Sequence, residues 1–483
     1  MIHPTYDGFY PGWLETWRAG TGLRDETCPP EHWLQHLWRH QRIVRDALVL
    51  ADGRGFKVLH PGFWNRGPGP DFKGAILRFD DGPAVHGDVE IDVEASGWVT
   101  HGHHANPAFQ RVILHGVWSR PRGPGALPTW VMSDALEAPM REMVPWLEGE
   151  APGLIPANVR GGCCAPLRRL GDEAMQGLLA QAARHRLERK AGELLHRARH
   201  RGWEGALWEG LVSALGYRHN TWPLRCLAEW VSPEHDRMDV VGAQACLLGL
   251  SGLLPAQPDG PNAVQLRALW DRWWREAGRW PAGGLPMEAW RLAGLRPANH
   301  PERRLAMAGH WLASGPRGPA LVDAVLGAAN TAEAVERVGR VLQPGADAFW
   351  DSHWTLGSVA SRTAPLLGGP RMVDLAVNVV LPWLWARATS AAAPVAGATL
   401  ADGDVAARVW RRFEEWPAGE DNAVLKMARL RLMGAERRRL PRTAAMQQGL
   451  LQVAADFCDA SNALCEGCGF PALVEAWGAR QGR

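Results

Sequence analysis

Residues 65–118, NRGPGPDFKGAILRFDDGPAVHGDVEIDVEASGWVTHGHHANPAFQRVILHGVW, decide the fold of the chain. Two apolar runs separated by turn residues, 75–79 and 85–93, predict neighbouring β-strands. A short helical piece at 106–110 and a further apolar strand at 112–118 follow. The stretch therefore predicts a small β-sheet with a helical crossover.

The residues before this stretch complete the predicted order of elements. Apolar side chains recur at helical spacing over 31–46, after a Pro-Pro pair that favours a helix start at Glu31. The segments 48–50 and 56–59 flank an Asp-Gly turn and predict a β-hairpin. The order is helix, three strands, short helix, strand, so the first third is predicted to be α/β.

Acidic residues alternate along the second strand of the stretch. Asp88, Glu90 and Asp92 share one face of a strand, because successive side chains point to opposite sides. Carboxylates this close repel one another unless a cation lies between them. Oxygen ligands suit Mg²⁺ or Mn²⁺. The pattern predicts a metal-dependent active site.

Four histidines follow the acidic strand: His101, His103, His104 and His115. In a glycine-containing loop, His101 is a candidate general base near the acids. Imidazole prefers Zn, Mn, Fe or Ni to Mg, so a mixed centre of Glu90 with His101, His103 and His115 is an alternative. Histidines that cap turns or lie in the core are the other interpretation.

The motif Pro70-Asp71, followed by Glu90 on the next strand, resembles the PD-(D/E)XK nuclease superfamily. That pattern is an Asp, then Glu/Asp-x-Lys on the following strand, with an upstream helical Glu in some branches, which Glu31 matches. The resemblance implies a restriction-endonuclease-like fold, phosphodiester hydrolysis with Mg²⁺ or Mn²⁺, and a nucleic acid partner, DNA more than RNA. This sequence departs from the pattern at Asp92, which occupies the lysine position. Lys73 is a candidate substitute that would stabilise charge on the phosphate.

A second resemblance covers nearly the whole chain. The motifs GPDF at 69–72, GDVEI at 87–91, HGHH at 101–104 and VILH at 112–115 are similar to a bacterial family known only as a domain of unknown function. Its later landmarks are also present at 294–306 and 377–388, together with a terminal group of cysteines. This resemblance implies no activity.

The rest of the chain is predicted to be mainly helical. We expect an irregular arm at 1–30, the metal-dependent core at 31–125, a Pro/Gly-rich linker at 126–162, a helical domain at 163–450 and a cysteine segment at 451–483. The helical domain begins with a basic stretch. Its candidates for contact with nucleic acid phosphates are Arg186, Arg189, Lys190 and Arg197. A solvated helix face is the alternative for these four residues.

The terminal cysteines have the spacing of a metal site, Cys458-x6-Cys465-x2-Cys468. A fourth soft ligand would close a Zn or Fe–S site, and Cys163 or Cys164 would supply it from far upstream. The layout resembles PD-(D/E)XK exonucleases that hold a [4Fe-4S] cluster with one distant cysteine and three near the C-terminus. Buried reduced cysteines are the alternative.

Composition excludes several classes of protein. The formal net charge of +2 predicts no strong overall attraction to nucleic acid or to membranes. No apolar run reaches the roughly 18–20 residues that span a bilayer, and the first residues lack the pattern of a signal peptide. We therefore expect a cytoplasmic protein with reduced or metal-bound cysteines. A metal-dependent nuclease is the leading prediction. The alternatives are another His/carboxylate metalloenzyme and an inactive protein that binds nucleic acid or serves as a scaffold.

Overall fold

The computed structural model describes residues 6–20, 29–45, 48–65, 68–121, 123, 127–140, 143, 163–217, 219–234, 237–280, 284–293, 295–390, 402–433, 440, 442–459 and 468–481. The chain divides into two compact units. The sheet unit comprises residues 12–153, and the helical unit comprises residues 1–11 and 154–483. Each unit is described by itself.

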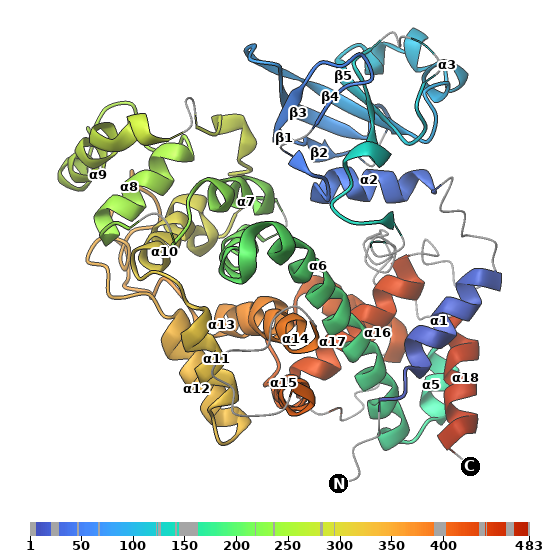
Figure 1. Ribbon diagram of the computed structural model, residues 1–483. Coiled ribbons are helices and arrows are strands. Elements are labelled where there is room, and N and C mark those ends of the chain that lie inside the picture. Colours follow the sequence, from blue (N-terminus) through green and yellow to red (C-terminus); the bar gives the residue numbers. More distant parts are fainter. Residues whose placement is uncertain are drawn as a thin grey trace. The chain divides into compact units, whose positions relative to one another are not determined.

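The sheet unit is built on a mixed sheet with the order β1-β3-β4-β5-β6, and β2 also pairs with β3 (Figure 1). The antiparallel part joins β1, β2 and β4 to β3, whereas β4, β5 and β6 run parallel. The strands are β1 (Phe56–His60), β2 (Phe63–Trp64), β3 (Phe72–Phe79), β4 (Ala84–Asp92), β5 (Val112–Val117) and β6 (Thr129–Val131). The α/β prediction for this region is confirmed.

Helix α2 (Glu31–His40) packs against the sheet (Figure 1). Its Trp38 is fully buried and donates from Nε1 to the Pro61 carbonyl at 2.8 Å. The helix is shorter than the predicted segment 31–46. It ends because Gln41 adopts a left-handed conformation with φ of 50°, and its backbone N–H bonds the carbonyls of the last turn.

The crossover from β4 to β5 is compact and made of three short turns. These are α3 (Gly97–Thr100), η2 (His103–Ala105) and η3 (Pro107–Phe109). The last of them matches the helical piece predicted at 106–110. Asn106 begins it, because its side-chain oxygen accepts a hydrogen bond from the backbone N–H of Ala108 at 3.0 Å. The crossover places the histidine loop at the end of β4.

The sheet differs from the prediction at both edges. Strand β6 lies within the predicted linker 126–162, because the apolar run Trp130–Val131 pairs with β5. The segment predicted as a strand at 48–50 forms isolated bridges instead, at Val49 and Leu50. Leu50 pairs with Trp130, and the Phe56 N–H bonds the Leu48 carbonyl, so this segment links β1 to β6 and curls the sheet.

The arm predicted at 1–30 is also more regular than expected. It contains helix α1 (Phe9–Gly20), which begins in the helical unit. Tyr10 is fully buried there, and its hydroxyl donates to Asp456 at 2.8 Å. Aromatic packing thus orders a segment whose glycine and proline content predicted irregular structure.

The helical unit confirms the prediction of a mainly helical region after residue 163. Its longer helices are α5 (Cys164–Arg169), α6 (Asp172–Ala214), α7 (Thr221–Trp230), α8 (Val240–Leu250), α9 (Ala263–Glu276), α10 (Pro301–Ala313), α11 (Gly318–Leu326), α12 (Thr331–Leu342), α13 (Gly369–Leu375), α14 (Leu381–Thr389), α15 (Asp402–Glu415), α16 (Ala423–Met433), α17 (Ala444–Val453) and α18 (Phe470–Gln481). Two π-helical turns, η8 (Ala376–Val380) and η9 (Ala454–Asp459), precede α14 and follow α17.

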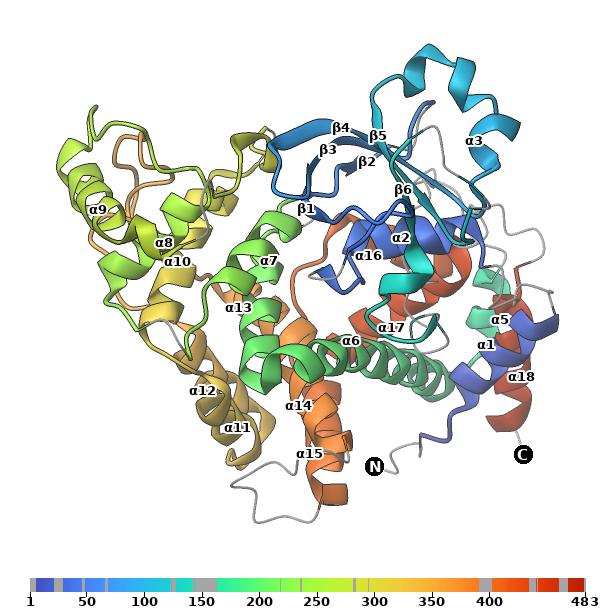
Figure 2. The same ribbon diagram turned by 45° about the horizontal axis from the view of Figure 1, so that its top comes forward.

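Helix α6 is the centre of the helical unit, and α14 and α17 pack along it (Figure 2). It kinks at Gly202, whose φ of 70° favours glycine. Among the described residues, none of the helices combines the length and the apolar character that crossing a membrane requires.

Candidate active site

The alternating acids of β4 are all buried. Asp88, Glu90 and Asp92 are only 7%, 6% and 2% exposed, and Val89 and Ile91 between them are fully buried. Asp88 is hydrogen-bonded to the neighbouring strand β3, where its Oδ1 accepts a hydrogen bond from the backbone N–H of Gly74 at 3.0 Å. The other two carboxylates are therefore the ones that remain for a site.

Asp71 and Glu90 hold each other in place across β3 and β4. The backbone N–H of Asp71 donates to Glu90 Oε2 at 3.0 Å, and the backbone N–H of Ile91 donates to Asp71 Oδ2 at 3.0 Å. Each carboxylate is thus fixed by the strand that carries the other. The two residues predicted to form the core of the site lie together.

Helix α2 adds a third carboxylate through an amide. Gln35 Nε2 donates to Glu31 Oε1 at 2.9 Å and to Asp71 Oδ1 at 2.9 Å. Glu31, a predicted candidate, is therefore linked to Asp71 through the Gln35 amide. Gln35 was not among the predicted site residues, although its position four residues after Glu31 places both side chains on one face of the helix.

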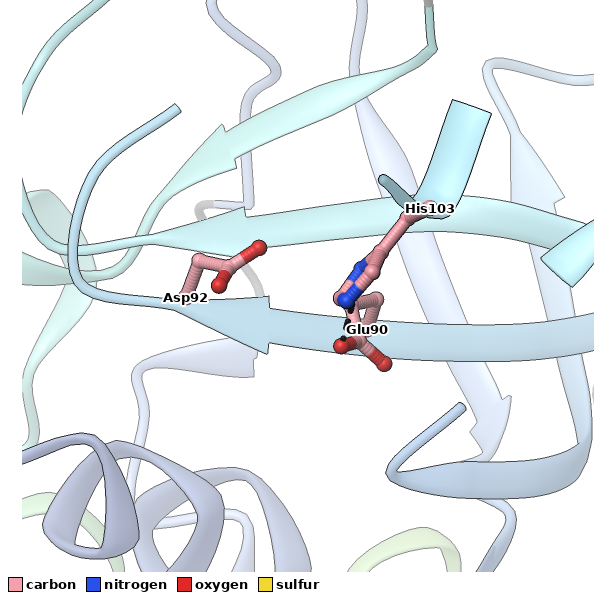
Figure 3. A group of neighbouring side chains, drawn as sticks. All are labelled: Glu90, Asp92 and His103. Atoms are coloured by element: carbon pink, nitrogen blue, oxygen red, sulfur yellow. Dashed lines mark ion pairs between the residues drawn. The ribbon is translucent and has the colours of Figure 1, made fainter. Parts of the chain in front are cut away.

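The histidine loop lies over the acids of β4. His103 Nδ1 is 3.2 Å from Glu90 Oε1 (Figure 3). His101 Nδ1 is 3.1 Å from Asp92 Oδ1, and His115 Nε2 is hydrogen-bonded to Asp92 Oδ2 at 2.9 Å. One ligand atom from each of Glu90, Asp92 and His103 lies within 4.8 Å of the other two. These three residues are a candidate metal centre.

Aromatic side chains hold the histidines in position. The ring of Phe109 stacks on that of His103, with centroids 4.0 Å apart, and Trp98 meets His103 and His115 at 5.6 and 5.7 Å. Trp98 and Phe109 are themselves part of a small buried cluster with Val112. The imidazoles are thus oriented by apolar contacts from the crossover and β5.

Burial shifts the pKa values of the acids in the site. Burial, followed by the charge of the neighbouring Asp71, raises the pKa of Glu90 to about 9. Burial also raises the pKa of Asp71 to about 7 and that of Glu31 above its usual value, while it lowers the pKa of His103. Such perturbed carboxyls are typical of functional sites, because folding has placed charges where water does not stabilise them.

A family model described as "Protein of unknown function (DUF2851)" matches residues 31–400. The chain belongs to the DUF2851 family. The match begins at the first residue of α2 and includes every acid and histidine of the candidate site, so the predicted family resemblance is confirmed. Comparisons with curated proteins and with solved structures gave no match.

In this DUF2851 chain, Lys73 does not contact the acids that it was predicted to assist. The side chain is exposed on β3, and its ammonium group donates to the Pro68 carbonyl at 3.3 Å. The described contacts of Lys73 reach neither Glu90 nor Asp92. At the lysine position of the nuclease motif the chain instead has Asp92, with two imidazoles at its oxygens.

The four basic residues predicted to contact phosphates are buried or have polar partners within the helical unit. Arg186 donates to Gln448 at 2.8 Å, and Lys190 donates to Asn378. Arg197 pairs with Glu209 at 3.0 Å, and Arg189 is buried. The reason is that α6 is the central helix of the unit and packs on more than one side. Arg186, Lys190 and Arg197 are half-buried and take part in this packing, and contact of the four residues with phosphates stays a prediction.

The cysteines of the predicted metal site converge only in part. Cys163 and Cys164 lie at the start of α5, Cys458 lies in η9, and Cys468 precedes α18. A salt bridge between Arg169 and Glu475 at 3.1 Å joins helices α5 and α18. The rings of Phe457 and Phe470 pack together with their centroids 4.9 Å apart.

These contacts bring the described cysteine segments into one region of the helical unit. Cys465 lies outside the described residues. Among those that are described, the group of three potential ligands within 4.8 Å is the one at Glu90, and no such group is found at the cysteines. The cysteine site stays a prediction.

Proposed function

We propose that this chain is a metal-dependent nuclease of the PD-(D/E)XK type, which hydrolyses phosphodiester bonds in DNA or RNA. The observation that carries the proposal is the pairing of Asp71 with Glu90 across β3 and β4, with Glu31 linked to Asp71 through Gln35. Three carboxylates from a helix and two adjacent strands thus meet at one point.

The order of elements supports the same assignment. A helix, α2, precedes three strands that pair antiparallel, β1, β3 and β4, and a crossover then leads to the parallel strand β5. Asp71 directly precedes β3, and Glu90 lies on β4, which are the places that the nuclease motif gives to its two acids. Strand β6 is an addition to that core.

The donor set fits a divalent cation. Glu90, Asp92 and His103 offer three ligand atoms close together, and Asp71 and Glu31 add negative charge beside them. His103 Nδ1 is buried and lacks a hydrogen bond with acceptable geometry. Buried carboxylates at this density are stabilised by a dication, which supplies the charge that the missing lysine would have supplied in part.

Metal binding would supply an activated water and stabilise charge on the phosphate. Asp71 and Glu90 hold the site, and the backbone N–H groups of Asp71 and Ile91 keep their oxygens aligned. Asp92 orients the His101 imidazole, whose side chain is 52% exposed. As the P–O bond to the leaving sugar breaks, His101 would take a proton from the attacking water and pass it to the departing oxygen.

A cleavage assay tests the proposal. Labelled single- and double-stranded DNA and RNA are incubated with Mn²⁺ or Mg²⁺ and either the wild-type protein, Asp71→Asn/Glu90→Gln or Asp88→Asn. Asp88 is a matched control, because it is a buried acid of the same strand whose carboxylate bonds Gly74. Cleavage by the wild type and Asp88→Asn, but not by the double variant, supports the nuclease. Binding without cleavage would favour the inactive nucleic-acid-binding alternative.

One observation favours a second candidate, a His/carboxylate metalloenzyme of another class. His103 belongs to the group of potential ligands, and two further imidazoles lie at Asp92. Such a donor set is also typical of zinc and iron centres. Elemental analysis of the purified protein separates the two candidates. Tightly bound Zn or Fe that is lost in His103→Asn, without cleavage of any nucleic acid, would favour the second.

A further inference from the structure

His103 enters the site from the crossover with a fixed orientation. It begins η2, after Gly102 in the left-handed conformation with φ of 73°. Its ring stacks on Phe109 with an interplanar angle of 20° and meets the edge of Trp98. These ring contacts hold the imidazole with Nδ1 directed toward Glu90 (Figure 3).

The contact of His103 with Glu90 is short but is not a hydrogen bond. The two atoms are 3.2 Å apart, whereas Nδ1 is shielded from solvent and has no partner with hydrogen-bond geometry. A nitrogen lone pair and a carboxylate oxygen at this distance repel each other unless a proton or a metal ion lies between them, and the geometry here does not suit a shared proton. A bound cation satisfies both atoms, with Asp92 as the third ligand.

We propose that His103 is a metal ligand and that this ligand makes the site select a first-row transition-metal dication over Mg²⁺. The inference deepens the proposed function and rests on its metal site. Mg²⁺ takes oxygen ligands and water in strict octahedral geometry, whereas Mn²⁺, Fe²⁺ and Zn²⁺ accept imidazole. One nitrogen in the coordination sphere therefore changes the order of affinities.

The test compares His103→Asn with His104→Asn. The amide oxygen of asparagine reaches the position of imidazole Nδ1, so the first variant exchanges a nitrogen ligand for an oxygen ligand. His104 is a matched control, since it is the next residue of the same turn and is exposed. Binding of Mn²⁺ is measured from the EPR signal of the free ion, and binding of Mg²⁺ by competition.

We expect the wild type and His104→Asn to bind Mn²⁺ about tenfold or more tightly than Mg²⁺. In His103→Asn the affinity for Mn²⁺ should fall by about tenfold, and that for Mg²⁺ by less than about threefold. Unchanged Mn²⁺ affinity in His103→Asn would overturn the inference. An equal loss for both ions would also overturn it, because the histidine would then act on the fold.

A second measurement needs no variant that might misfold. Electron spin echo envelope modulation of Mn²⁺ bound to the wild-type protein detects the nitrogen of a coordinated imidazole. We expect this modulation in the wild type and in His104→Asn, and its absence from the wild type would contradict the inference. Because neither experiment contains nucleic acid, a failed cleavage assay with intact Mn²⁺ selectivity would refute the nuclease and leave this inference standing.

Discussion

Glu90 is the residue on which the site depends most. It faces Asp71 from one side and His103 from the other, and its pKa is raised to about 9 by burial and by Asp71. Asp71 itself has a pKa raised to about 7. Without a metal, both carboxyls therefore hold protons in the neutral range, and a cation must displace them.

Metal affinity should therefore depend on pH. As pH rises through about 7 and toward about 9, the carboxyls of Asp71 and Glu90 lose their protons, so we expect Mn²⁺ to bind more tightly at each step. Calorimetry at pH 7 in buffers with different ionisation enthalpies should show protons released on binding. Affinity that is flat from pH 6 to 9 would contradict the raised pKa values.

Stability of the metal-free protein should have the opposite dependence. The pKa of Glu90 is higher in the folded chain than in the unfolded chain, so the folded state binds more protons and stability falls as pH rises from about 4.5 toward about 9. The glutamine of Glu90→Gln cannot ionise, so this variant should not lose stability at position 90 as pH rises. In the presence of EDTA at pH 8 we expect it to unfold at higher temperature than the wild type, and near pH 4 to match it. A lower melting temperature at pH 8 would refute this account.

At the scale of elements, alternation along β4 was sufficient to predict which acids share a face. The pairing of Asp71 with Glu90 also followed from motif order. His103 was harder, because its contact with Glu90 depends on three short turns of the crossover whose path has no periodic signal. The end of α2 at His40 was missed for a similar reason, since the left-handed Gln41 is set by its local hydrogen bonds.

Helix α2 contributes to the site through Gln35. Because this amide bonds both Glu31 and Asp71, Gln35→Leu should free the two carboxylates and lower both the Mn²⁺ affinity and the cleavage rate, each by about tenfold. Gln110→Leu, at an exposed position of the crossover, is the control. Isothermal titration with Mn²⁺ and a cleavage assay would check this. Equal values for the two variants would remove Gln35 from the account.

Helix α6 shows why the environment of a basic stretch is hard to predict from sequence. Its charges recur along a helix, which a sequence pattern cannot distinguish from a solvated face. In the structure, the partners of Arg186, Lys190 and Arg197 come from residues far along the chain or beyond the kink at Gly202. Only the packing of α14 and α17 on α6 reveals that these side chains are half-buried.

At the scale of the whole molecule, the division into an α/β region and a helical region could be predicted, and the boundaries could not. Strand β6 is short and surrounded by proline and glycine, so its apolar run gave a weak signal. The same holds for α1, where buried Tyr10 outweighs the local composition. Each unit therefore includes a segment, β6 or α1, whose composition alone predicts irregular structure.

The cysteine prediction belongs to this scale, because its residues come from distant parts of the chain. We expect Zn or Fe in anaerobically purified protein, and its loss in Cys468→Ser but not in Cys246→Ser, whose cysteine is buried within α8. Elemental analysis with a visible absorbance spectrum distinguishes Zn from an iron–sulfur cluster. Equal metal content in both variants would show that Cys468 is not a ligand.

The most direct test of the central claim is the rate of phosphodiester cleavage as a function of Mn²⁺ concentration for the wild type, Glu90→Gln and Asp88→Asn. We predict that the wild type and Asp88→Asn cleave and saturate with Mn²⁺, whereas Glu90→Gln shows a loss of at least about a hundredfold at every concentration. Cleavage by Glu90→Gln at the wild-type rate would contradict a catalytic metal held by Glu90.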